Sequence, residues 1–167
     1  MSTKGNQSLN NIRDTPSTEM PFMPENHSVL PAVSDQNVLT PAESALRKAG
    51  FKVVVCRNGF DALIQCIDAP PTMLAIDELL DGIDGLSLIR LLYAIPRFRR
   101  TPFIFFPRKA GEYPMWATKR EIFGAVCFLS VPFHEEEFRR MAIRCAQGIH
   151  DGEFPRPDRD FEFIDTN

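Results

Sequence analysis

The sequence predicts a three-layer α/β sandwich in which a five-stranded parallel sheet, in the doubly wound order 2-1-3-4-5, lies between five helices. Five short apolar runs alternate with five segments of helical periodicity along the chain. The runs are apolar at nearly every position, which is typical of parallel strands that are buried on both faces. Right-handed crossovers between such strands place helices on both sides of the sheet.

Length and charge limit the classes of protein that fit. The chain has 167 residues, which suits one domain with tails. Its net charge of −3 gives no electrostatic reason to expect nucleic-acid binding. No apolar run approaches the ~20 residues of a membrane span, and the N-terminal stretch lacks the apolar segment of a secretory signal. We therefore expect a cytoplasmic protein with neither nucleic-acid nor membrane partners.

Composition divides the chain into three parts. Residues 1–26 are rich in Ser, Thr, Asn and Pro without a sustained period, so we expect a disordered arm. The alternating strands and helices occupy residues 27–148, the expected domain. Residues 149–167 are acidic and contain prolines and aromatic residues, and we expect a flexible tail.

The first predicted strand and helix precede Gly50. Ser28–Val33 is apolar enough for a strand, although Pro31 cannot donate to a ladder. The motif Thr40-Pro41-Ala42-Glu43 supplies a threonine N-cap, a proline at the first helical position and a glutamate at N3. The sequence therefore predicts a helix that starts at this motif, runs to Ala49 and ends at Gly50.

The other predicted elements continue the alternation. Asn58 opens a helix whose apolar residues recur with the 3.6-residue period of an amphipathic helix, at Phe60, Leu63, Ile64 and Ile67. Further strands are predicted over residues 51–56, 73–76, 101–106 and 125–129, and further helices over residues 86–95, 115–123 and 134–148.

Cysteine spacing gives no sign of a metal or redox site. The four cysteines show no CxxC or zinc-type spacing, and we expect them to be reduced and mostly buried: Cys56, Cys66, Cys127 and Cys145.

The stretch Thr72–Gly85, TMLAIDELLDGIDG, places acidic residues at the end of a buried strand. Sites in open α/β sheets lie at the carboxyl ends of the strands, beside the point where the strand order reverses. In the order 2-1-3-4-5 this point lies between the first and third strands. The loops that follow these strands carry Ser34-Asp35 and Asp77-Glu78, so we expect them to meet. The spacing of the acids is not that of an EF-hand, so no dedicated calcium site is expected.

Four stretches of the chain resemble landmarks of one known family. LRKAGF (46–51) is similar to the end of the first helix of response-regulator receiver domains, and RNGFDAL (57–63) to their "DGxEAL" motif. AIDELLDGIDGLSLIR (75–90) resembles the phosphoacceptor loop "LLDxxMPxMDGxxLxR", and GAVCFLSVPF (124–133) resembles the closing "GAxxYLxKPF". The resemblance covers roughly residues 27–148 and implies the flavodoxin-like (CheY-like) fold.

The resemblance also assigns site residues. Asp77 matches the aspartate that accepts a phosphoryl group from a phosphohistidine or a small phosphodonor, a reaction that requires Mg²⁺. The implied Mg²⁺ ligands are Asp35, Asp77 and Leu79. The two adjacent acids that the family places after the first strand fall on Val33 and Ser34, and Asp35 is the next residue.

Other positions depart from the family pattern. The hydroxyl residue after the fourth strand falls on Pro107, the lysine of "KPF" falls on Val131, and the aromatic switch position falls on Phe128. Arg108 or Lys109 is a candidate to replace the missing lysine. The Val131-Pro132 bond matches one that is cis in the family, and we expect a cis bond here.

Two functions follow from the resemblance. The first is a stand-alone signalling protein of a two-component phosphorelay, which acts through protein–protein contact and has Asp77 as candidate phosphoacceptor. The alternative is a divergent pseudo-receiver, an adaptor that binds its partner without phosphorylation. The expected partner is a sensor histidine kinase or another signalling protein, bound on the face of the fourth helix, fifth strand and fifth helix, where Trp116 is the candidate anchor. We expect no enzyme activity, since no GxGxxG or Walker motif follows the first strand. The oligomeric state stays open.

Overall fold

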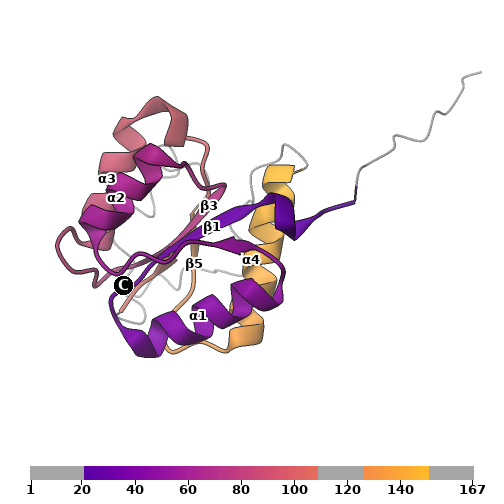
Figure 1. Ribbon diagram of the computed structural model, residues 1–167. Coiled ribbons are helices and arrows are strands. Elements are labelled where there is room, and N and C mark those ends of the chain that lie inside the picture. The colour runs from indigo at the N-terminus through magenta and orange to yellow at the C-terminus, as the bar shows by residue number, and fades with distance from the viewer. Residues whose placement is uncertain (1–20, 109–125, 151–167) are drawn as a thin grey trace, which may run out of the picture.

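Five parallel strands form a single sheet in the order β2-β1-β3-β4-β5. The computed structural model describes residues 21–108 and 126–150 (Figure 1). The observed order confirms the fold class predicted from the sequence. The strands are β1 (Ser28–Ala32), β2 (Lys52–Val53), β3 (Met73–Asp77), β4 (Phe103–Phe106) and β5 (Val126–Phe128).

Helices cover both faces of the sheet, so the molecule has three layers (Figure 1). On one face lie α1 (Gln36–Lys48) and α4 (Glu135–His150), which are joined by an ion pair of 2.6 Å between Lys48 Nζ and Glu135 Oε1. On the other face lie α2 (Gly59–Asp68) and α3 (Gly85–Ala94). Short 3₁₀ turns, η1 (Pro24–Asn26) and η2 (Pro96–Phe98), complete the described elements. The helix expected over residues 115–123 lies outside the described residues.

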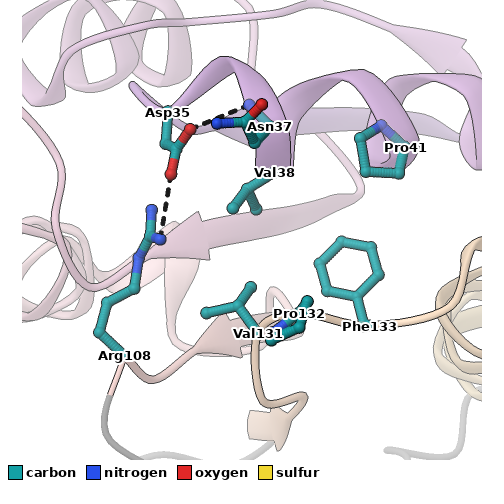
Figure 2. Close-up of a pocket in the computed structure, with 8 residues that line it drawn as sticks. All are labelled: Asp35, Asn37, Val38, Pro41, Arg108, Val131, Pro132 and Phe133. Carbon is teal, nitrogen blue, oxygen red and sulfur yellow. Dashed lines mark hydrogen bonds and ion pairs between the residues drawn. The ribbon is translucent and has the colours of Figure 1, made fainter.

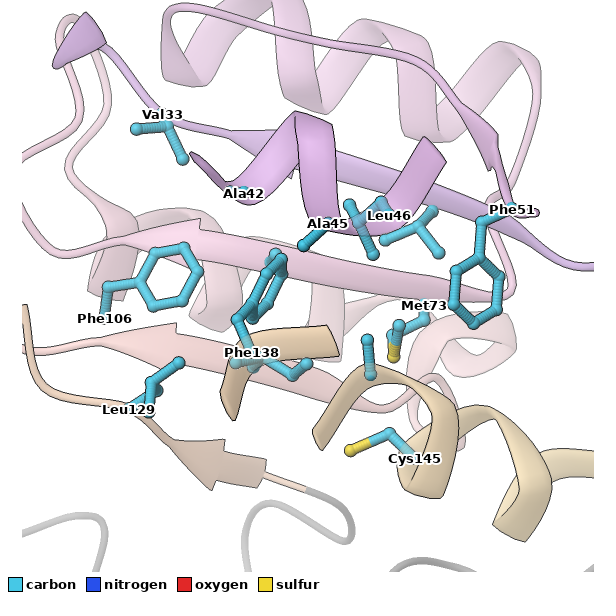
Figure 3. Close-up of a cluster of buried hydrophobic side chains, with 14 of the residues drawn as sticks. Val33, Ala42, Ala45, Leu46, Phe51, Met73, Phe106, Leu129, Phe138 and Cys145 are labelled. Atoms are coloured by element: carbon cyan, nitrogen blue, oxygen red, sulfur yellow. The ribbon is translucent and has the colours of Figure 1, made fainter. Parts of the chain in front are cut away.

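Each face of the sheet has its own hydrophobic core. The cluster beneath α1 and α4 includes Val33, Phe106 and Phe138 (Figure 3). The cluster beneath α2 and α3 includes Leu74, Leu88 and other fully buried side chains. Every residue of β3 is buried because this central strand contacts both cores. The sheet therefore holds the end of β3 rigidly.

Helix α1 starts five residues earlier than the sequence predicts. Asp35 is its N-cap, and its carboxylate accepts a hydrogen bond of 2.9 Å from the backbone N–H of Asn37. The Thr40-Pro41 motif consequently lies inside the helix. An aspartate cap at the end of β1 starts the helix before the threonine can do so. The helix ends at Lys48, one residue before the predicted end, with Ala49 as its C-cap. Gly50 follows with a φ of 93°.

Strand β2 is shorter than the predicted range 51–56. Lys52 and Val53 alone form the regular strand, and a single bridge between Ala32 and Cys56 continues the pairing. The backbone N–H of Cys56 donates to the carbonyl of Pro31 at 3.0 Å. Pro31 itself has no N–H to donate to the neighbouring strand, so the ladder between β1 and β2 lacks one hydrogen bond at this point.

Of the four predicted apolar residues of α2, only Leu63 packs against the core. The 3.6-residue period correctly predicts the helix, but Phe60 and Ile64 are each 58% exposed and Ile67 is 45% exposed. The buried face instead consists of small residues, Gly59, Ala62 and Cys66. The cause is close packing, because a Cβ at Gly59 would lie 2.1 Å from the carbonyl oxygen of Ile83.

The remaining elements agree with the sequence except at their ends. Helix α4 continues past Gly148, the predicted end, to His150. The Val131-Pro132 bond is cis, as expected, and the four cysteines are not joined by disulfides. None of the helices in residues 21–108 and 126–150 has the length and hydropathy of a transmembrane span. The domain bounds 27–148 stay a prediction, and Phe22 already packs against the core.

Candidate functional site at the carboxyl edge of the sheet

Asp77 is the last residue of β3 and is 0% exposed. The backbone on either side of it is held in place. The N–H of Glu78 donates to the carbonyl of Phe106 at 3.1 Å, and the N–H of Gly85 donates to the carbonyl of Glu78 at 3.2 Å. A Cβ at position 85 would lie 2.1 Å from the carbonyl oxygen of Asp77, so only glycine allows α3 to start this close to the strand.

The guanidinium of Arg108 covers the Asp77 carboxylate. Arg108 Nε donates to Asp77 Oδ1 at 2.7 Å, and Nη2 donates to Oδ2. The backbone N–H of Leu79 also donates to Asp77 Oδ1, at 3.2 Å. This is a two-point arginine–carboxylate pair, the geometry in which such pairs are strongest. Both oxygens of Asp77 are therefore engaged.

Arg108 also joins Asp77 to two other acids. Its third nitrogen, Nη1, donates to Asp35 Oδ2 at 3.2 Å (Figure 2). Its backbone N–H donates to Glu78 Oε2 at 2.6 Å. The predicted meeting of the loops after β1 and β3 is thus confirmed, and the residue that joins them comes from the end of β4.

The hydrogen bonds of this cluster favour the charged forms of Arg108 and Asp35. The hydrogen bonds to Asp77 raise the pKa of the Arg108 guanidinium, and Asp35 adds to the effect. The pKa of Asp35 is lowered, first by the hydrogen bond from the Asn37 backbone and then by Arg108. A buried carboxylate without a cation would be costly, and Arg108 compensates the charge of Asp77.

The two positions where the family places its acid pair have other roles here. Val33 is 0% exposed and belongs to the core beneath α1 and α4. Ser34 Oγ donates to the carbonyl of Arg57 at 2.7 Å and accepts from the N–H of Asp81 at 2.8 Å. One hydroxyl therefore ties together the loops that follow β1, β2 and β3. Sequence reasoning missed this role, because a lone serine carries no signal of it.

The residues at this edge do not fit the implied Mg²⁺ as they are arranged. Asp77 uses both oxygens for Arg108, and Asp35 uses one for Arg108 and one for Asn37. The described ranges contain no group of three or more His, Cys, Asp or Glu side chains placed to hold a metal ion. Leu79, the third implied ligand, presents its N–H to Asp77. The guanidinium lies where the two carboxylates point, which is the place that a cation would need.

Asp81 and Asp84, two further acids of the stretch Thr72–Gly85, have structural contacts. The Asp84 carboxylate caps α3 by accepting from the Ser87 N–H at 2.9 Å and from its hydroxyl at 2.6 Å. Asp81 is exposed, and its backbone binds Ser34 and Gly59.

The predicted switch positions have apolar side chains that offer no hydrogen bond to a phosphoryl oxygen. Pro107 is buried and has no N–H. Phe128 packs edge-on against Phe105 with ring centroids 6.1 Å apart. Val131 packs against the core beneath α1 and α4 and lines a pocket. Lys109 and Trp116 lie outside the described residues, so of the two candidates for the missing lysine the structure shows Arg108 in place.

A pocket of about 270 Å³ opens beside the ion pair, between the start of α1 and the loop that joins β5 to α4 (Figure 2). Its wall is polar near Arg108 and apolar near Phe133. The stacking of Phe133 on Phe106, with ring centroids 5.1 Å apart, fixes the apolar side. The lining residues are Asp35, Asn37, Val38, Pro41, Arg108, Val131, Pro132 and Phe133.

Known proteins resemble this chain in sequence and in fold. No family model matches the sequence. Protein PilG of Pseudomonas aeruginosa is 32% identical over 96 residues, which are 58% of this chain and 70% of PilG. The chemotaxis protein CheY4 of Vibrio cholerae superimposes with a TM-score of 0.62 at 19% identity, over 71% of this chain and 97% of CheY4.

A third relative carries a metal. The receiver domain of the sensor histidine kinase PA1611 from Pseudomonas aeruginosa, solved with magnesium coordinated in its active-site cleft, has a TM-score of 0.59 at 22% identity and covers 72% of this chain and 98% of that domain. The chain belongs to the family of CheY-like response-regulator receiver domains, the receivers of two-component signalling. In this member of the family, Arg108 is hydrogen-bonded to both carboxylate oxygens of the buried Asp77.

Proposed function

We propose that this receiver-family protein signals through protein–protein contact without phosphorylation of Asp77. The observation that carries the proposal is the two-point pair between Arg108 and the fully buried Asp77. Of the two functions expected from the sequence, this geometry favours the pseudo-receiver.

The pair removes the nucleophile that phosphorylation requires. A carboxylate oxygen attacks phosphorus through a lone pair that faces the phosphodonor. Here Asp77 Oδ1 accepts from Arg108 and Leu79, and Oδ2 accepts from Arg108. A phosphodonor would first have to displace the guanidinium, which would leave a buried carboxylate without its counter-charge.

Among the described residues, two positions that would stabilise a transferring phosphoryl group lack the side chains for it. Positively charged and hydrogen-bonding groups around the phosphoryl oxygens supply most of the rate enhancement in phosphoryl transfer. The positions of the hydroxyl and the lysine hold Pro107 and Val131. Arg108 is a cation at the site, but its charge is already paired with those of Asp77 and Asp35.

The partner in this proposal is a sensor histidine kinase or another protein of a two-component pathway. Receiver domains of this family work with such proteins, and the proposal extends this class of partner to the present chain. Under the proposal the chain has no enzyme activity, and its binding to a partner is the same before and after treatment with a phosphodonor.

The test is a titration of the full chain with beryllofluoride and millimolar Mg²⁺, followed by two-dimensional amide NMR. The proposal expects no saturable shift of the amides around Asp77. The matched variant is Arg108→Ala, which leaves Asp35 and Asp77 uncovered. It is expected to gain a Mg²⁺-dependent shift that the double variant Arg108→Ala/Asp77→Asn lacks. Saturable shifts in the unmodified protein that Asp77→Asn abolishes would instead establish Asp77 as a phosphoacceptor.

A further inference from the structure

Two cysteines that the site does not use lie in contact with each other. Cys127 of β5 and Cys145 of α4 place their Sγ atoms 3.3 Å apart, although they are 18 residues apart in the sequence. We propose that Cys127 and Cys145 are a modification site: the two thiols become joined to each other in a disulfide bond. The oxidant is a small-molecule disulfide such as glutathione disulfide. From the sequence alone we expect the opposite, four reduced cysteines without a redox role.

The geometry requires little movement. A disulfide needs a sulfur–sulfur distance of about 2.05 Å, so the two Sγ atoms have to approach by a little more than ~1 Å from their present separation. The pair joins the last strand to the helix that packs over it. Cys127 is half-buried and Cys145 is 1% exposed. Cys127 is therefore the thiol that an oxidant meets first, and Cys145 is the thiol that completes the bond.

The reaction balances with the oxidant as the only added reagent. The Cys127 thiol loses its proton, and its sulfur attacks one sulfur of glutathione disulfide, which breaks that bond and releases one glutathione thiolate. Cys145, after losing its own proton, attacks the Cys127 sulfur of the mixed disulfide and releases the second glutathione. The two released thiolates take up the two protons. The cysteines lose two electrons in total, and glutathione disulfide gains them.

The other two cysteines provide an internal comparison. Cys56 and Cys66 lie in the core on the opposite face of the sheet and are 7% and 0% exposed. Burial raises the pKa of Cys56, and burial raises the pKa of Cys66 to about 12. Because the thiolate is the reactive form, burial disfavours attack by either thiol. Cys145 is as deeply buried, so the proposed pair is distinguished by the 3.3 Å contact between its two Sγ atoms and by the partial exposure of Cys127.

A disulfide here would enclose part of the pocket wall. The closed ring would run from β5 through Val131, Pro132 and Phe133 to the middle of α4. These three residues line the pocket beside Arg108. Oxidation would therefore fix the position of the β5–α4 loop relative to the strand, and this effect is separate from the chemistry of Asp77.

The test uses the full chain with Cys56→Ser and Cys66→Ser, so that two thiols remain. The reduced protein is incubated with excess glutathione disulfide, blocked with N-ethylmaleimide and digested with trypsin. Arg139, Arg140 and Arg144 lie between the thiol pair, so trypsin places the two cysteines in different peptides. The proposal expects these peptides to be joined within one chain. It also expects the Tm of the oxidised protein to rise by on the order of 5 °C or more.

Controls make the result decisive. Cys127→Ser and Cys145→Ser are each expected to abolish the joined peptides and the rise in Tm, and circular dichroism checks that both variants fold. The wild-type chain is expected to show the same joined peptides as the two-thiol protein. The proposal is overturned if both thiols of the folded protein remain open to N-ethylmaleimide after oxidation. A glutathione adduct on Cys127 that Cys145 does not resolve, or a bond between two chains, overturns it equally.

Discussion

Arg108 brings one fixed positive charge to a place where the receiver family uses a lysine and a metal ion. Its three guanidinium nitrogens each donate to a carboxylate of Asp77 or Asp35. Asp77 is 0% exposed, whereas the Arg108 side chain is 20% exposed. Because Asp77 is the more deeply buried of the two, losing its partner should cost the protein more stability than losing the partner of Arg108.

The unequal burial predicts an unequal response to substitution. Arg108→Ala leaves a buried carboxylate without a partner and is expected to lower the free energy of unfolding by about 3 kcal/mol. Asp77→Asn leaves an arginine that reaches water, so it is expected to cost less. Adding Asp77→Asn to Arg108→Ala should restore part of the loss. Urea unfolding of the four proteins measures these terms as a double-mutant cycle. A double variant no more stable than Arg108→Ala would show that the buried charge is not the cause.

Asp84 predicts how stability depends on pH. Hydrogen bonds from Ser87, first from its side chain and then from its backbone, lower the pKa of Asp84 in the folded protein. A carboxyl whose folded pKa is depressed stabilises the fold fully above its unfolded pKa, about 3.9. This contribution is lost as the pH falls through the folded pKa. We expect Asp84→Ala to cost about 1 kcal/mol at pH 7 and Asp84→Asn to cost little, since asparagine is an equally good N-cap.

The matched pair of Asp84 variants separates the cap from the charge. Thermal unfolding of both variants between pH 7 and pH 2 is the measurement. Asp84→Asn should lose less stability than the unmodified protein below about pH 4, because it has no proton to take up there. An identical acid profile for the unmodified protein and Asp84→Asn would contradict this account.

At the scale of elements, α2 and α3 show that helical periodicity does not say which face is buried. Both helices pack on the same side of the sheet (Figure 1). Leu88 of α3 is 0% exposed, but Ile64 of α2 is 58% exposed. Gly59 approaches Ile83 so closely that no larger side chain fits at this point of the inner face of α2. Phe60, Ile64 and Ile67 are exposed, whereas Leu63 packs against the core.

This arrangement predicts a large loss of stability for one truncation to alanine and almost none for another. Leu88→Ala removes fully buried apolar atoms and leaves a cavity, so it is expected to lower the free energy of unfolding by about 2–5 kcal/mol. Ile64→Ala removes atoms that are mostly in contact with water, and a change within about 0.5 kcal/mol is expected. Urea denaturation at constant pH measures both. A large loss in Ile64→Ala would mean that the outer face of α2 is covered in solution.

The start of α1 shows a second limit of local sequence signals. Thr40-Pro41 carries a strong start signal, but Asp35 stands earlier and already has an oxygen in position to accept from Asn37. Local propensity alone does not decide between two competing caps. The end of β1 decides, because it determines where the chain leaves the sheet.

At the scale of the whole molecule, the strand order and the meeting of the acidic loops could be predicted because both follow from topology. Alternating apolar runs specify a parallel sheet, and its order brings the ends of β1 and β3 together. The contacts within the site could not be predicted in the same way. Arg108 contacts Asp77, Asp35 and Glu78 at once, which depends on the geometry of the chain just after β4. The role of Ser34 depends on three loops that are distant in sequence.

The hydroxyl of Ser34 also determines what an acidic residue at this position would disrupt. An ionised aspartate at this position could accept from the Asp81 N–H, but it has no hydrogen to give to the Arg57 carbonyl. An aspartate at position 34 would therefore break one of the links between the loops. Removal of Arg108 would leave Asp77 without its counter-charge. Each of these single substitutions is unfavourable by itself, so the Ser34 hydroxyl and the Arg108 guanidinium both stabilise the present arrangement.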